Sequence, residues 1–105
     1  PNDTMYFDTV RLIELEERLG MPMGDIILMK FGMKFCLFSC IIGLKHLYKP
    51  NNPVIFFSKK IDEALEKGVT LNDMGMQIAL ALNKTGMFDH ANDTEEEQNE
   101  EKNVN

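Results

Sequence analysis

The stretch FCLFSCIIGL, residues 35–44, decides the fold, because it is the longest uncharged apolar run in the chain. Its 10 residues are about half of the ~20 that an α-helix needs to cross a bilayer. Lys34 and Lys45 border it on either side. We therefore interpret residues 34–48 as a buried helix enclosed by other helices, and not as a membrane span.

The sequence before this segment predicts two more helices. Asp8 is a good N-cap for a helix over residues 9–19, and Gly20 suits its C-terminal end. Burial of one leucine face should stabilise this helix, because its ion pairs are worth only ~0.2–0.5 kcal/mol each. The face consists of Leu12, Leu15 and Leu19. Pro22 suits the first turn of a shorter helix that ends or bends at Gly32.

The sequence after the central segment begins with a loop at residues 50–53, PNNP. Residues 54–57, VIFF, could form a short strand. The chain offers no second convincing strand, so an extended segment packed on helices is favoured. Ser58 is then the expected N-cap of a helix over residues 59–67, KKIDEALEK, which Gly68 ends.

The last predicted helix covers residues 71–84 and opens with a capping box formed by Thr70 and Asp73. Its core face should consist of Leu71, Met74, Ile78 and Leu82, which recur at helical spacing. Met76 and Leu80 lie one turn apart, roughly opposite that face. They are candidate partner-binding residues for self-association or for a client; the alternative is that neighbouring helices cover them.

The fold class expected is all-α: a small single-domain bundle of four or five helices over residues 1–90. Residues 91–105 carry a net charge of −5 and one sizeable aliphatic side chain, so we expect a disordered acidic tail. The remaining residues carry a net charge of only −1. A nearly neutral body lacks the basic surface that phosphate binding needs, so nucleic acid is not an expected partner.

Few residues are arranged for chemistry. Cys36 and Cys40 are one helical turn apart, but neither His46 nor His90 is at ligand spacing from them, so buried, inert thiols are favoured over a metal site. His46 is expected to be a structural or surface histidine. No glycine-rich phosphate loop or hydrolase motif is present. We predict neither a catalytic site nor a cofactor.

Three features point to an intracellular protein with an adaptable surface. Two cysteines cannot form a disulfide framework, and the opening PNDTMYFDTV has neither the basic nor the apolar region of a signal peptide. Eight methionines are many for 105 residues. Methionine fills gaps in small cores, but it also suits interfaces that repack around different partners.

The order of these segments resembles that of the tail assembly chaperones of long-tailed bacteriophages. The opening helix matches the family pattern L-x-x-L-E-x-x-L-G over residues 12–20, and GLKH at residues 43–46 matches the end of its apolar helix. A looser match, at the start of the last helix, involves Val69, Thr70, Leu71, Met74 and Gly75. The resemblance covers about residues 6–86, while VIFF and the wholly apolar 35–44 run fit the pattern less well.

The resemblance implies a non-enzymatic protein of the host cytoplasm that is absent from the mature virion. Such chaperones bind and solubilise the tape measure protein, commonly form homo-oligomers, and are thought to recruit the tail tube protein through a frameshifted longer form. Two alternatives stay open: a small helical phage regulator that binds a host protein, and a structural head–tail component.

Overall fold

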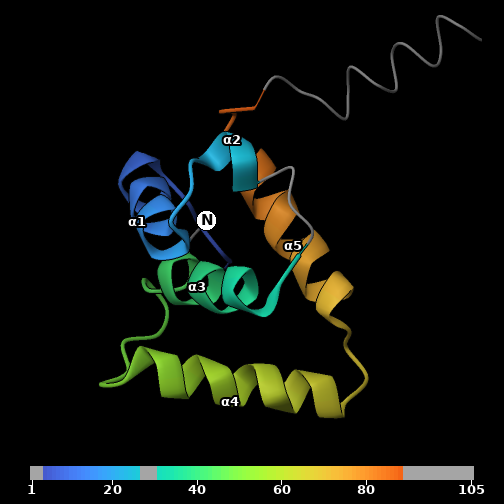
Figure 1. Ribbon diagram of the computed structural model, residues 1–105. Helices are drawn as coiled ribbons and strands as arrows, with labels where there is room; N and C mark the ends of the chain where they lie inside the picture. The colour runs from blue at the N-terminus through green and yellow to red at the C-terminus, as the bar shows by residue number, and fades with distance from the viewer. Residues whose placement is uncertain (1–3, 27–30, 89–105) are drawn as a thin grey trace, which may run out of the picture.

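The computed structural model describes residues 4–26 and 31–88, and all of the regular secondary structure in these ranges is helical (Figure 1). The predicted all-α fold is therefore confirmed. The five helices in this part of the chain are α1 (Thr9–Leu19), α2 (Met23–Ile26), α3 (Met33–Gly43), α4 (Pro53–Glu66) and α5 (Leu71–Asn83). The predicted tail at residues 91–105 and His90 lie outside the described residues.

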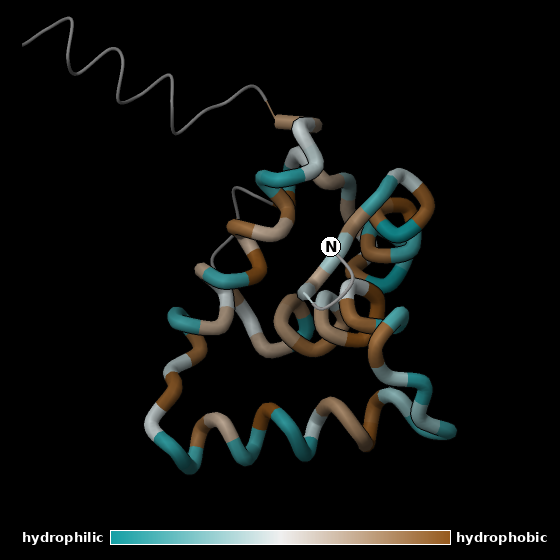
Figure 2. Tube along the Cα trace, turned by 180° about the vertical axis from the view of Figure 1, so that it is seen from behind, coloured by the Kyte–Doolittle hydropathy of each residue, from teal (hydrophilic) through white to brown (hydrophobic). Residues whose placement is uncertain are grey.

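Helix α3 is the centre of the fold, and α1, α4 and α5 each pack on it. In Figure 1, α4 runs beneath α3, while α1 and α5 stand on opposite sides above it. Figure 2 shows from behind that α4 alternates between apolar and hydrophilic residues, whereas α3 is mainly apolar. This difference agrees with their positions, because a helix enclosed by others has no hydrophilic face.

The residues that α3 buries confirm its predicted central position: Phe35, Cys36, Ser39, Ile41, Ile42 and Gly43. Its predicted end at residue 48 was wrong, because the helix stops at Gly43. The Gly43 carbonyl accepts a 2.8 Å hydrogen bond from the backbone N–H of Tyr6, and the N–H of Leu47 turns instead to the carbonyl of Leu44. The incoming N-terminal segment thus takes the acceptor that another helical turn would use.

Helix α4 corrects two sequence predictions. VIFF is neither a strand nor an extended segment, and Ser58 is not an N-cap, because both lie inside this helix. The N-cap is Asn52, whose side chain accepts a 3.2 Å hydrogen bond from the N–H of Ile55. Pro53 occupies the first turn, where its fixed φ and missing N–H are no disadvantage. Asn52 and Pro53 therefore begin a helix, where a loop was expected.

The predicted ends of α1 and the predicted start of α5 agree with the structure. Asp8 accepts a 3.0 Å hydrogen bond from the N–H of Arg11, and Gly20 ends α1 in the left-handed region at φ 70°. Thr70 and Asp73 form the predicted capping box of α5, with reciprocal bonds of 2.9 and 3.0 Å. Along α5, Ile78 and Leu82 are buried, and Leu71 and Met74 are half-buried against the same core.

Gly75 is buried at the point where α5 meets Phe31, and this contact gives a first prediction. Glycine inside a helix is normally about 1 kcal/mol less favourable than alanine. Here a methyl group would lie 2.7 Å from Phe31 Cβ and closer still to its ring, which stacks on Phe35. We expect Gly75→Ala to lower the free energy of unfolding by about 1–3 kcal/mol through overpacking.

Denaturant unfolding measures this change, and Gly24→Ala in α2 is the matched control. A methyl group at Gly24 would meet no atom within 4 Å, so that variant should be neutral or slightly stabilising. If the free energy of unfolding rose equally in both variants, the contact between α5 and Phe31 would be contradicted.

Candidate functional site

The two thiols of α3 are free and enclosed. Cys36 is fully buried, and burial raises the pKa of its thiol. Burial, together with repulsion from Cys36, raises the pKa of the half-buried Cys40 thiol to about 11. Within the described residues, no three His, Cys, Asp or Glu side chains gather as a metal site would require. The thiolate is the reactive form of cysteine, so a raised pKa makes a thiol less reactive. The raised pKa values of Cys36 and Cys40 therefore agree with the predicted inert thiols.

The second prediction concerns the reactivity of Cys40. At pH 8, a thiol with a pKa of about 11 holds roughly a hundredfold less thiolate than one at the ordinary value of 9.0. We expect iodoacetamide to modify the folded protein at least a hundredfold more slowly than the urea-unfolded chain, as followed by mass spectrometry. Rapid modification of folded Cys40 would show that its thiol is accessible and ionised.

His46 is a structural anchor for the segment that precedes α1. Its Nδ1 lies 2.9 Å from an NH1 nitrogen of Arg11, which can only donate, so Nδ1 accepts. Its Nε2 lies 2.8 Å from the carbonyl of Thr4, which can only accept, so Nε2 carries the proton. The neutral imidazole therefore joins the end of α3 to α1 and to the N-terminal segment. Of the two roles that the sequence left open, a structural or a surface histidine, this contact pattern favours the structural one.

The outward face of α5 is the candidate functional site. Met76 and Leu80 are each 52% exposed, whereas Ile78 and Leu82 on the inward face are 2% exposed. The structure thus places the two sequence-predicted residues together on the surface, one turn apart. Asp73 is the only charged residue within the bounds of α5, and its carboxylate is engaged in the capping box. Beyond this cap, the outward face of α5 has no charged residue within the helix and is partly apolar, as is typical of the core of a protein interface, where charged residues are depleted.

The exposed apolar side chains of α1 do not share this property. Val10 and Ile13 on α1 are 67% and 49% exposed, but the same helix carries five charged residues, Arg11, Glu14, Glu16, Glu17 and Arg18. Single exposed apolar side chains are normal on protein surfaces, and charged neighbours keep them hydrated. The absence of charge from residues 74–83 therefore distinguishes α5 from α1, and it could have been read from the sequence.

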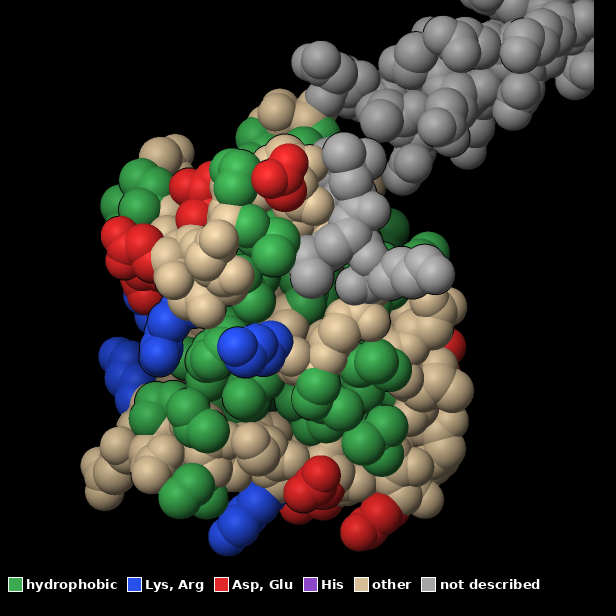
Figure 3. Space-filling model, viewed as in Figure 1, with side chains coloured by type: hydrophobic (Ala, Val, Ile, Leu, Met, Phe, Trp, Pro, Cys, Tyr) green, Lys and Arg blue, Asp and Glu red, His purple; other side chains and the backbone are tan. Residues whose placement is uncertain are grey.

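A second apolar area lies where the start of α3, the end of α4 and the start of α5 approach one another. Figure 3 shows apolar side chains gathered in this part of the surface, with acidic groups below them. Exposed apolar residues from the bordering segments are Met33, Leu65 and Val69. The sequence prediction missed this area, because its three contributing segments come together only in the folded chain.

Comparisons with known proteins give no relative from which a role could be transferred. No protein-family model matches the chain, and no curated protein or solved structure matches it significantly. Among the described residues, no helix is both long and apolar enough to cross a membrane.

Proposed function

We propose that this protein is a non-catalytic assembly chaperone that binds an apolar helical client through the outward face of α5. In the form that the sequence resemblance suggests, the client is the tape measure protein of a long-tailed bacteriophage. The chaperone would keep it soluble in the host cytoplasm until the tail tube protein assembles around it, and would be absent from the mature virion. A homo-oligomer is part of the same proposal.

The observation that carries the proposal is the half-exposed pair Met76 and Leu80 on a helix whose single charged residue, Asp73, is engaged in the capping box. Burying such a side chain fully is worth roughly 1.5–3 kcal/mol relative to leaving it in water. A helical client with its own apolar stripe could provide that burial. Methionine at position 76 can adjust its three rotatable side-chain bonds to successive, non-identical segments of a long client.

The resemblance supplies the identity of the client. The matched residues 12–20 cover most of α1 and its C-cap, and residues 43–46 cover the last residue of α3 and the turn that follows. Arg11 of α1, next to the first match, contacts His46 in the second. These residues support the fold rather than the surface of α5. The proposal therefore combines a family-like scaffold with a binding face argued from exposure and charge.

Co-expression tests the proposal. The tape measure protein of the same phage is produced in bacteria with and without this chain, and its soluble fraction is measured. We expect co-expression to raise that fraction severalfold and to yield a complex by size-exclusion chromatography. An insoluble tape measure protein and no complex would contradict the proposal. Mass spectrometry of purified particles tests separately whether the chain is absent from the virion; its stoichiometric presence would favour the head–tail component.

A further inference from the structure

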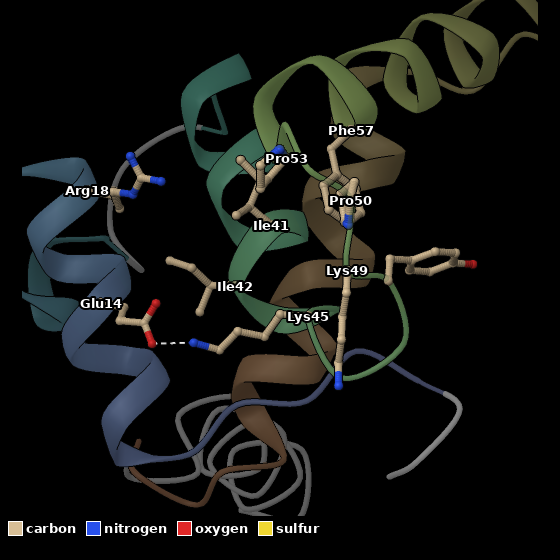
Figure 4. Close-up of a pocket in the computed structure, with 10 residues that line it drawn as sticks. Glu14, Arg18, Ile41, Ile42, Lys45, Lys49, Pro50, Pro53 and Phe57 are labelled. Carbon is tan, nitrogen blue, oxygen red and sulfur yellow. Dashed lines mark hydrogen bonds and ion pairs between the residues drawn. The ribbon is translucent and has the colours of Figure 1, made fainter.

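A pocket of about 330 Å³ lies away from the α5 face, where α1, α3 and the start of α4 meet (Figure 4). Its floor is apolar, because Ile41, Ile42 and Phe57 line it and are all buried in the core. Pro50 and Pro53 contribute a further apolar surface on one side. The volume is at the small end of the ~300–1,000 Å³ typical of ligand pockets.

The rim of this pocket is cationic. Arg18 comes from α1, Lys45 from the turn after α3, and Lys49 from the following loop, while Glu14 is the only acidic residue among the described residues that line it. Figure 4 shows Glu14 and Arg18 on one side, Lys49 and Phe57 on the other, and Ile42 between them. Lys45 and Glu14 form an ion pair across the α1–α3 contact. The pocket therefore carries a surplus of two positive charges.

This surplus is unusual for the molecule. The described residues carry nine Lys or Arg and nine Asp or Glu side chains, so that part of the chain is neutral. Three of the nine cations line this one pocket. Arg18 is held in place by Phe38, with its guanidinium carbon 5.0 Å from the centre of the ring. A ligand that complements the site must combine negative charge for the rim with an apolar group for the floor.

We propose that this pocket binds a short acidic peptide segment of a partner protein, with a leucine or phenylalanine side chain on the floor and flanking carboxylates at Arg18 and Lys49. Guanidinium and ammonium groups form their strongest hydrogen bonds with carboxylates. The acidic residues 91–105 of this chain supply the charge, but their only sizeable aliphatic side chain is Val104. Residues 91–105 therefore offer negative charge for the rim of the pocket but little apolar surface for its floor. For this reason we assign the pocket to a segment of a partner protein.

Fluorescence polarisation with the full chain tests the proposal. The probe is a fluorescein-labelled peptide, Glu-Glu-Leu-Glu-Phe-Glu, and the matched peptide carries serine in place of leucine and phenylalanine. The test variant combines Arg18→Glu with Lys49→Glu. Lys59→Glu is the control, because Lys59 is an exposed α4 residue that does not line the pocket. Circular dichroism verifies that each variant is folded.

We expect the double variant to bind the probe at least tenfold more weakly than the wild type, and Lys59→Glu to bind within a factor of two. The serine peptide should bind at least fivefold more weakly, and the amide signals of Ile41 and Ile42 should shift on titration. Equal binding by the test and control variants, or no shift at these isoleucines, would overturn the proposal. So would much tighter probe binding after truncation behind His90, because that would make residues 91–105 the occupant. None of these outcomes depends on the α5 face.

Discussion

Phe57→Ala is expected to lower the free energy of unfolding by about 3–5 kcal/mol, the usual cost of emptying a buried aromatic site. Phe57 is 3% exposed, and Ile61 is the only other buried residue of α4. The Phe57 ring also contacts the rings of Phe56 and Tyr48 edge-on, with its centroid 5.0 Å from that of Phe56 and 6.0 Å from that of Tyr48. Loss of this side chain therefore removes one of the two buried side chains through which α4 packs on the core.

Denaturant unfolding followed by circular dichroism measures the change, and hydrogen exchange locates it. The amides of α4 should lose more protection than those of α1, because α4 detaches first. Ile55→Ala in the same helix is the control: Ile55 is 53% exposed, so its replacement should change stability by no more than about 0.5 kcal/mol. Similar losses in the two variants would show that α4 does not pack on the core through Phe57.

Ile42→Ala is expected to cost about 2–5 kcal/mol, because Ile42 is 1% exposed in the helix on which the other long helices pack. Ile13→Ala, at a 49% exposed position of α1, is the matched control and should be nearly neutral. Thermal and denaturant unfolding measure both variants. A loss below about 0.5 kcal/mol at Ile42 would contradict the central position of α3.

Other apolar residues of α3 lie at different depths. Ile41 is buried, whereas Phe38 is half-buried and carries the guanidinium of Arg18 over its ring. The same helix buries Ser39, whose hydroxyl has no hydrogen-bond partner within the described residues. A buried, unpaired hydroxyl is costly. The spacing of apolar residues in the sequence indicates which of them share a face of a helix. How deeply each side chain is buried depends on which neighbouring element covers it.

Local signals predicted most helix ends, because a cap acts within a few residues. Asp8, Gly20 and the Thr70–Asp73 pair needed no tertiary information. The end of α3 did require tertiary information. The backbone N–H of Tyr6, which lies 37 residues from Gly43 in the sequence, donates a hydrogen bond to the Gly43 carbonyl. The error at VIFF was different: Asn52 followed by Pro53 is a local helix start that was interpreted as a loop.

The candidate site was predictable only in part. Helical spacing placed Met76 and Leu80 together, opposite the core face of α5, but their exposure depended on whether another helix covers them. In the structure each stays 52% exposed. The pocket at Ile42 could not be predicted, because Arg18, Lys49 and Phe57 converge only after α1 and α4 pack on α3.

The affinity for a tape measure fragment, measured for the wild type and for the double variant Met76→Asp, Leu80→Asp, tests the central claim most directly. Val10→Asp, Ile13→Asp is the control, because it introduces the same charges at exposed apolar positions of another helix. We predict that the α5 variant folds like the wild type but binds at least tenfold more weakly, equivalent to about 1.4 kcal/mol, while the control binds normally. Unchanged binding by the folded α5 variant, or its unfolding, would contradict the claim that this face is the binding surface.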